Sequence, residues 1–323
     1  MLNITKFNSA KYTESLSMSK ASAPSRYAVW FQAVRAPFFT AAVMPVFLAA
    51  AYALSVKWPI DWIIFTLAIL GMVFLHAGTN CINDYCDFNN GVDKKTTFGS
   101  SRVLVDGLMP PRHMLIESLI LFGLGSGIGL VITAWRGPVI LGIGAIGVAG
   151  GYFYSARPFG LKYKALGDIM VFLLFGPCLA WGACYALTAT HGIPVILASI
   201  PLGLLVTGIL HANNIRDMRD DRTAAIRTLP LLIGLQGSQT MYFLLIAGAY
   251  AGILALSLGR ILPWSSLAVF LSLPLAVNNI RAINAVKEDN LKAIAAMDVQ
   301  TARLHLAFGL LLVMGIGFAG IVR

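Results

Sequence analysis

Residues 62–79 read WIIFTLAILGMVFLHAGT, and NCINDYCDFNNGVDKK follows directly at residues 80–95. The uncharged run continues to residue 83, which is long enough for a membrane-spanning helix of roughly 20 residues. The segment after it crowds amides and carboxylates against the end of that helix. Ionisable groups are costly at a membrane, so this junction predicts both a transmembrane helix and a functional site at its end.

The composition of the whole chain is that of a membrane protein. Of its 323 residues, 58% are hydrophobic and only 12% are charged, whereas about a quarter are charged in soluble domains. Eight uncharged windows are long enough for helical spans: 36–56, 62–83, 118–135, 137–156, 169–215, 228–259, 261–280 and 304–322. The window 169–215 has double length and is broken by the Gly and Pro of THGIP at 190–194. The sequence therefore predicts an all-α, polytopic protein with nine transmembrane helices.

Lys and Arg are distributed unevenly around these spans, and basic loops stay on the cytoplasmic side. Of the 24 basic residues, Lys57, Arg136, Arg260 and Arg323 fall on one side and all the others on the opposite side. The N-terminus and the acidic junctions are therefore expected to face the cytoplasm, in a bacterial inner or plasma membrane. The net charge of +10 follows from this topology and from attraction to the lipid bilayer, so no nucleic-acid partner is expected.

The chain shows no linker between helices. Residues 1–25 are polar and rich in Ser, Lys and Ala, and we expect a flexible cytoplasmic tail there. Residues 26–323 are expected to form a single transmembrane domain. The string LHAGTNCINDYCD at 75–87 has a counterpart in LHANNIRDMRDD at 210–221, four helices later. This repeat predicts two similar four-helix halves plus a ninth helix.

Both junctions place acids and amides at helical spacing. The first brings together Asn83, Asp84 and Asp87, and Asp93 follows. The second stacks Asn213, Asp217 and Asp221 at successive intervals of four, and Asn214 flanks them. Like charges at this spacing repel each other, and carboxylates with amide oxygens suit Mg²⁺, which completes its shell from phosphate oxygens. Basic residues suited to the remaining phosphate oxygens are interleaved with the acids: Lys94, Lys95, Arg102, Arg216, Arg219, Arg222 and Arg227.

The two acidic motifs, at 83–87 and 217–221, resemble those of the UbiA superfamily of intramembrane prenyltransferases. VRAPFFTAAVMPV at 34–46 is similar to the first helix of that family. YSARPFGLKYKALGDIMVFLLFGP at 154–177 and NNIRDMRDDRTAAIRTLP at 213–230 are most similar to the branch that prenylates 1,4-dihydroxy-2-naphthoate in menaquinone biosynthesis. One departure is Gly91, where the commonest family motif ends in Asp and this chain supplies Asp93 instead.

The resemblance implies transfer of a polyprenyl group from a polyprenyl diphosphate to an aromatic acceptor, with decarboxylation if the acceptor is dihydroxynaphthoate. The acids that it implies for catalysis are Asp84, Asp87, Asp217 and Asp221, and Asn83 and Asp93 join them as Mg²⁺ ligands. Substrate-binding residues would be Arg35, Asn83, Arg102, Tyr154, Lys162, Asn213 and Asn214. Arg35, Arg102 and Lys162 would clamp the diphosphate, although Lys162 suits the carboxylate of the acceptor equally well. Tyr154 would shield the allyl cation with its ring, or else only anchor the interface.

Two other interpretations of the sequence stay open. The same chemistry suits another acceptor, such as 4-hydroxybenzoate or homogentisate. An ion-coupled secondary transporter also carries paired acids within the membrane, but at mid-span instead of at helix ends. His76 and His211 are expected to be buried hydrogen-bonding groups, and Asp168 only to offset the dipole of its helix.

Overall fold

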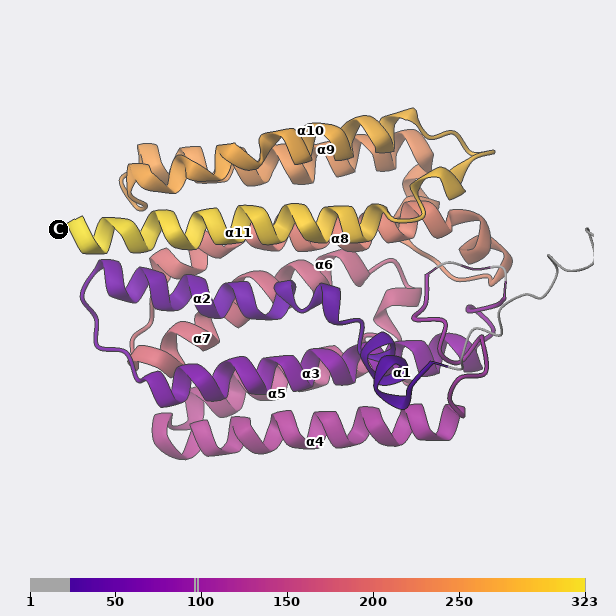
Figure 1. Cartoon of the computed structure of the whole chain (residues 1–323), viewed down its shortest axis with the longest axis horizontal. Coiled ribbons are helices and arrows are strands. Elements are labelled where there is room, and N and C mark those ends of the chain that lie inside the picture. The colour runs from indigo at the N-terminus through magenta and orange to yellow at the C-terminus, as the bar shows by residue number, and fades with distance from the viewer. Residues whose placement is uncertain (1–23, 96, 98, 323) are drawn as a thin grey trace, which may run out of the picture.

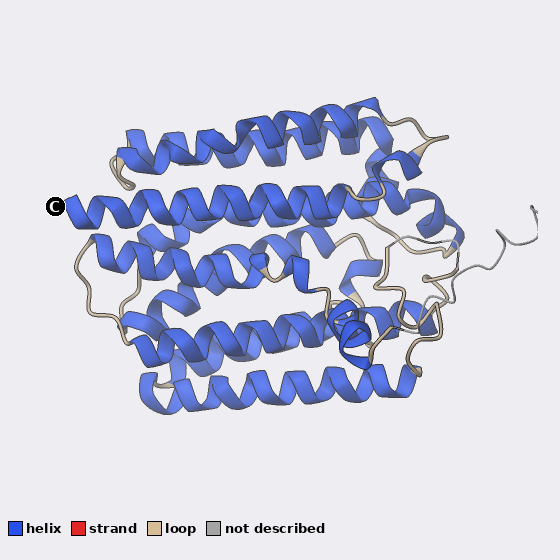
Figure 2. Cartoon of the chain, viewed as in Figure 1, coloured by secondary structure: helices blue, strands red, loops and turns tan. Residues whose placement is uncertain are grey.

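The structure consists of helices packed side by side in a bundle (Figure 1). It is a computed structural model, and it describes residues 24–95, 97 and 99–322. No β-strand occurs within these residues (Figure 2). The all-α prediction is therefore confirmed, while the tail predicted for residues 1–25 lies, up to residue 23, outside the described residues.

Seven helical segments of the described chain are long and apolar enough to cross a bilayer. Four of them are single helices: α3 Trp62–Asn89, α4 Pro111–Arg136, α8 Ile193–Thr223 and α9 Leu229–Leu258. Three are built from consecutive shorter helices: α6 Gly167–Leu173 with η4 Leu174–Cys178 and α7 Leu179–Thr188; η5 Trp264–Ser272 with α10 Leu273–Ala285; and η6 Leu291–Ile294 with α11 Met297–Val322. These segments identify an integral membrane protein.

The remaining apolar helices are shorter or bent. Helix α5, Pro138–Phe153, is apolar but has only 16 residues. Helix α2, Thr40–Ser55, makes an eighth span only together with the segment Arg26–Phe38, from which it is bent by 52°. That segment holds α1 Arg26–Ala33 and η2 Ala36–Phe38. The predicted number of nine transmembrane helices therefore stays a prediction.

Local sequence accounts for the helix boundaries. The side chain of Asp61 caps α3 by accepting hydrogen bonds from the backbone N–H groups of Ile63 and Ile64, both at 3.1 Å. Helix α4 begins at Pro111 and ends before Gly137. The break predicted within residues 169–215 is found between Thr188, where α7 ends, and Ile193, where α8 begins.

Helix α8 lies at the centre of the bundle (Figure 1). Of its most apolar window, 61% is buried, whereas no other candidate span exceeds 39%. A side chain on Gly203 of α8 would meet the Cα atom of Gly176 at 3.1 Å, so only glycine lets these two backbones approach so closely. This close approach packs α8 against η4, which directly follows α6.

Candidate functional site

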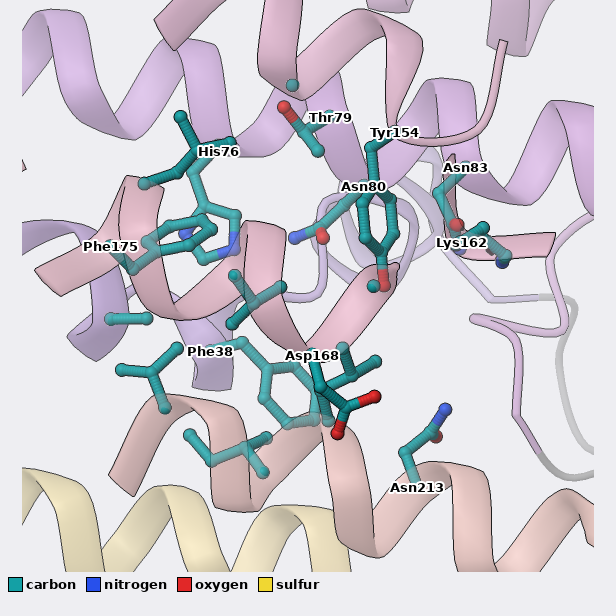
Figure 3. Close-up of a pocket in the computed structure, with 18 of the residues that line it drawn as sticks. Phe38, His76, Thr79, Asn80, Asn83, Tyr154, Lys162, Asp168, Phe175 and Asn213 are labelled. Atoms are coloured by element: carbon teal, nitrogen blue, oxygen red, sulfur yellow. Dashed lines mark hydrogen bonds between the residues drawn. The ribbon is translucent and has the colours of Figure 1, made fainter. Parts of the chain in front are cut away.

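One cavity of about 260 Å³ is bordered by the polar ends of α3 and α8. Residues of both predicted motifs line it, together with the three residues expected between them: Asn83, Asp87 and Asp93; Asn213, Asn214 and Asp221; and Arg35, Tyr154 and Lys162. Deeper in the bundle the lining becomes apolar, with Phe38 and Phe175 among its side chains (Figure 3). The site is therefore a polar mouth above an apolar chamber.

Lys162 organises the wall formed by α3. This residue belongs to η3, Leu161–Tyr163. Its ammonium group donates to the side-chain oxygen of Asn83 at 2.7 Å and to a carboxylate oxygen of Asp87. The hydroxyl of Tyr163 donates to the other oxygen of Asp87 at 2.7 Å. Ser155 donates to the same oxygen of Asn83, also at 2.7 Å. The Asp87 carboxylate is thus fully paired in the metal-free site.

Asp84 is turned toward the loop that follows α3. One of its oxygens forms an ion pair with Arg35, and the other accepts a hydrogen bond from the backbone N–H of Ser101 at 3.0 Å. Its side chain is 2% exposed, and it does not line the cavity. Arg35 itself does line the cavity, from a left-handed backbone position with φ of 53° between α1 and η2.

Arg216 organises the wall formed by α8. Its guanidinium group binds both oxygens of Asp217 at 2.8 Å, a paired geometry that fixes the carboxylate. It also binds Asp298 of α11 at 2.8 Å and donates to the side chain of Asn213. Asp217 is therefore committed to Arg216 and does not line the cavity. Asp221, one turn further, lines it and accepts only a long bond of 3.3 Å from Thr228 among the contacts described.

Two hydrogen bonds join the loops that carry these groups. The N–H of Ala165 donates to the carbonyl of Arg227 at 2.8 Å, and the N–H of Arg227 donates to the carbonyl of Tyr163 at 3.1 Å. The loop with Lys162 is thus attached to the loop that follows the second acidic motif. Burial, and then the charge of Asp87, raises the pKa of the Tyr163 hydroxyl, which therefore stays protonated as a donor.

Asp93 supplies the remaining acid on the cavity wall. The pKa of this carboxyl is raised to about 7, chiefly by burial and then by the negative charges of Asp87 and Asp84, while Arg35 and Lys162 lower it. The carboxylates of Asp84, Asp87 and Asp93 are thus close enough to interact electrostatically.

The structure separates Arg102 from the other predicted residues. Its guanidinium group pairs with Asp106 at 2.7 Å and donates to the carbonyl of Thr97 at 3.0 Å, and the Arg102 side chain is 35% exposed. It does not line the cavity. Of the twelve residues proposed from sequence, the three outside the lining are thus Arg102, Asp84 and Asp217.

Two residues for which the sequence suggested only modest roles also lie at the cavity. Asp168 and His76 both line it (Figure 3). The ring of His76 lies 5.6 Å from that of Phe39 and 5.0 Å from that of Phe175. His211 is fully buried behind Asp168 and hydrogen-bonded to it, as expected for a buried polar group. Asp168 and His211 are 43 positions apart on different helices, so no spacing rule connects them.

The donor set at the mouth suits a magnesium ion bound with phosphate. No group of three or more His, Cys, Asp or Glu side chains in the described part of the chain is arranged as a ready coordination shell. Mg²⁺, however, usually takes only one or two carboxylates and completes its shell with water and phosphate oxygens. Asp87 and Asp93 offer such carboxylates on one side of the cavity, and Asp221 offers one on the other.

Comparison with known proteins gives this site its context. The model of the UbiA prenyltransferase family matches residues 42–306. The chain is 30% identical to the 1,4-dihydroxy-2-naphthoate octaprenyltransferase of Bacillus subtilis over 290 residues, 89% of this chain and 92% of that protein. It is 27% identical to the 2-carboxy-1,4-naphthoquinone phytyltransferase of Synechocystis, over 96% of this chain and 99% of that one.

A solved structure shares the fold. It is a UbiA homologue from Archaeoglobus fulgidus, bound to GPP and Mg²⁺, with a TM-score of 0.57 and 17% identity over 88% of this chain and 99% of that one. Because the family model covers both acidic motifs and most of the chain, this protein belongs to the UbiA prenyltransferase family and is a membrane-embedded prenyltransferase.

Proposed function

We propose that this protein transfers a polyprenyl group from a polyprenyl diphosphate to 1,4-dihydroxy-2-naphthoate, with loss of carbon dioxide, in menaquinone biosynthesis. The observation that carries the proposal is the cavity itself, where acids from both motifs and two cations face an apolar chamber. The polar mouth suits a metal-bound diphosphate, and the chamber suits a prenyl chain. The names of the Bacillus and Synechocystis relatives support a naphthoate-type acceptor.

We propose that Mg²⁺ is held between the two acidic motifs, as it accompanies GPP in the Archaeoglobus homologue. Asp87, Asp93 and Asp221 face the cavity and would meet it directly. Asp84 and Asp217 would join only after release from Arg35 and Arg216. The amide oxygen of Asn83 is a further ligand. When bound, Mg²⁺ supplies neutralisation of the charge that develops on the leaving diphosphate.

The cations of the chain itself have a second use during binding. Arg35 and Lys162 are paired with Asp84 and Asp87 in the metal-free site. When the carboxylates take a metal partner, the two cations become available for the diphosphate oxygens, so the charges exchange partners without any group being left unpaired. Asn213 and Asn214 line the opposite wall as further hydrogen-bonding groups. We place Arg102 outside this exchange, because its partner is Asp106.

The apolar chamber protects the reacting carbon. An allylic cation is rapidly captured by water, so its site has to exclude water. Tyr154 lines the cavity between polar side chains such as Asn83 and Lys162 and apolar ones such as Phe175 (Figure 3). From there its ring face can shield a cation that forms between the diphosphate and the acceptor.

We further propose the arrangement of the chain in its membrane. Nine spans result if the bent pair with α2 counts as one span and α5 as another beside the seven long segments. Residues 26–323 then form one domain of two similar four-helix halves plus α11, with the mouth of the cavity in the cytoplasm of a bacterial cell. The lengths and charges of the helices support this arrangement.

The test is prenyl transfer by the purified protein in lipid nanodiscs, with a radiolabelled polyprenyl diphosphate. We expect transfer to dihydroxynaphthoate with Mg²⁺, none after chelation, and recovery when Mg²⁺ is restored. Asp87→Asn should lower kcat by about a hundredfold or more, because a ligand is lost where charge develops. Asp289→Asn makes the same chemical change at an exposed acid and should not alter the rate.

Two outcomes would revise the proposal. Transfer to 4-hydroxybenzoate or homogentisate but not to dihydroxynaphthoate would change the acceptor and leave the chemistry intact. Full activity of the chelated protein, or of Asp87→Asn, would overturn the metal-dependent mechanism.

A further inference from the structure

Asp168 and His211 form a buried pair that belongs to neither acidic motif. The Nδ1 atom of His211 lies 2.9 Å from one carboxyl oxygen of Asp168, and the Nε2 atom lies 3.2 Å from the backbone carbonyl of Ser238. Asp168 is 3% exposed and His211 is fully buried. The pair thus links the start of α6, the middle of α8 and α9 at one point of the cavity wall.

The partners of His211 fix the number of protons in this pair. A carbonyl oxygen only accepts hydrogen bonds, so Nε2 must carry a proton that it donates to Ser238. Between Nδ1 and the facing oxygen of Asp168 there is one more proton, which belongs either to the imidazole or to the carboxyl group. Both arrangements leave the pair neutral overall. In both, the second oxygen of Asp168, Oδ2, has no proton and can only accept a hydrogen bond.

Oδ2 of Asp168 is buried and has no hydrogen-bond partner in the described part of the chain. Asp168 lines the cavity together with Phe38, Asn213 and Tyr154 (Figure 3). An unpaired buried acceptor is costly, and such groups are usually satisfied by a ligand or by water. The position therefore calls for a donor group that arrives from the cavity.

The chemistry of the reactants decides which of them supplies this donor. A diphosphate offers only acceptor oxygens and negative charge, and a prenyl chain has no polar hydrogen. An aromatic acceptor carries a phenolic hydroxyl on a flat apolar ring, which matches an acceptor oxygen in a cavity that Phe38 also lines. We propose that Asp168 binds a hydroxyl group of the aromatic acceptor through Oδ2, and that His211 is the positioning residue that holds this carboxyl group. This inference rests on the proposed function, because it assigns a place to the acceptor of that reaction.

The pair also explains a discrimination that the motifs do not provide. Every acceptor considered for this site bears a phenolic hydroxyl, and an acceptor that lacks it would leave Oδ2 unpaired. A site built to bind a hydroxyl group rejects the analogue without it more strongly than an apolar pocket rejects a methyl group. Asp168 would thus select a phenol over its ether.

The test compares an acceptor with its methyl ethers, each hydroxyl being blocked in turn. In the wild-type protein we expect kcat/KM to be about ten- to a hundredfold higher for the free hydroxyl than for one of the two ethers, the loss of one hydrogen bond to a buried acceptor. In Asp168→Ala this preference should fall to within about threefold. The KM for prenyl diphosphate should stay unchanged. Because the chemical effect of the methyl group is the same in both proteins, only the change in preference reports on Asp168.

Two further variants keep the test decisive. Asp168→Asn should keep most of the preference, because its amide can donate to Nδ1 of His211 while its oxygen faces the cavity. Thr40→Val is the matched control, since it removes another 2.9 Å hydrogen bond to a buried histidine, His305, outside the cavity lining. It should leave the preference as in the wild type.

The outcomes separate this inference from the proposed function. If the wild-type protein prenylates no aromatic acceptor, the proposed function fails and the inference fails with it. If the wild type is active and Asp168→Ala keeps the full preference, the inference alone is overturned. Should Asp168→Ala not fold, Asp168→Leu, which also removes Oδ2, takes its place, and a folded Asp168→Leu protein that keeps the full preference overturns the inference equally.

Discussion

Ion pairs within the chain prepare the acids of both motifs. Asp84, Asp87 and Asp217 each hold a cation of their own: Arg35, Lys162 and Arg216. A carboxylate that is buried without a partner is strongly destabilising, so these pairs allow the bundle to fold before any metal binds. In the proposed mechanism each pair exchanges its partners when the metal-bound diphosphate enters. Asp93 is different, because it has burial without a dedicated cation.

That difference gives Asp93 a measurable pH dependence. Its pKa is about 7 in the metal-free protein, whereas an unfolded chain has an Asp pKa of about 3.9. Between these values the folded protein holds a proton that the unfolded chain has lost, so Asp93 increasingly favours unfolding as the pH rises from about 4 to about 7. We expect Asp93→Asn, without metal, to raise the midpoint of thermal unfolding at pH 8 by about 2–4 °C and to leave it unchanged near pH 4.

The control for this measurement is Asp289→Asn, at an exposed acid, which should shift neither midpoint. Equal stabilisation by Asp93→Asn at both pH values would show that the carboxylate charge is not the cause. With Mg²⁺ and diphosphate present the order should reverse, because the wild-type carboxylate then has its cation.

The loop between α3 and α4, residues 90–110, connects parts of the site that no single helix reaches. The backbone N–H of Ser101 donates to Asp84, and the carbonyl of Ser101 accepts a hydrogen bond of 2.6 Å from Gln32 of α1. Gly99 lies directly against the second motif, since a Cβ atom there would stand 2.4 Å from a carboxylate oxygen of Asp217. The loop thus contacts α1, α3 and α8 at once.

Gly99→Ala should therefore disturb the site without removing any of the proposed ligands. The added methyl group must displace either the loop or the Asp217 carboxylate, and overpacking of this kind costs about 1–3 kcal/mol. We expect the KM for prenyl diphosphate to rise by about tenfold, with a smaller effect on the KM for the aromatic acceptor. Gly127→Ala in α4 is the control, because nothing lies within 4 Å of a Cβ atom there. An unchanged KM in Gly99→Ala would show that the loop adjusts freely.

The helices were predictable from sequence more fully than the contacts between them. Charged residues are so rare that they delimit the apolar windows, and the windows 62–83 and 118–135 lie within α3 and α4, although α3 continues past Asp84 and Asp87. The bend before α2 was not predictable, because it depends on the left-handed backbone of Arg35. The exposure of Arg102 depends on the path of the loop, which leaves that side chain beside Asp106.

The missed partners within the site have a similar cause. Arg216 binds Asp298, 82 positions later, and Asp168 binds His211 from another helix. Helical spacing relates neighbours on one helix, and it carries no information about which helices meet. The motif acids were found because each set repeats along a single helix. Their partners on other helices could be identified only once the packing of the bundle was known.

The whole molecule has two ends of different character. The site, the loop of residues 90–110 and both acidic motifs gather at one end of the bundle, and the C-terminal end of α11 lies at the other (Figure 1). At that opposite end Arg136 pairs with Asp61 at 3.2 Å. The basic residues follow the same division, which is the basis for placing the mouth of the cavity in the cytoplasm.

Cysteine labelling tests this orientation. Lys57 and Lys94 are both exposed, at opposite ends of the bundle, and the four native cysteines can be replaced beforehand. In spheroplasts, we expect a membrane-impermeant maleimide to modify Lys57→Cys but not Lys94→Cys. Inverted membrane vesicles should give the opposite pattern, and detergent should expose both. Labelling of Lys94→Cys from outside would place the site on the other face of the membrane.

The two backbone hydrogen bonds between residues 163–165 and Arg227 have a consequence for the history of this fold. They couple the connection between α5 and α6 to the loop between α8 and α9, so the lengths of these segments are not independent. An insertion in either would pull the other out of register and carry Lys162 away from Asp87. An insertion in one segment should therefore be retained in evolution only with a compensating insertion in the other. The connections at the opposite end of the bundle can change length independently.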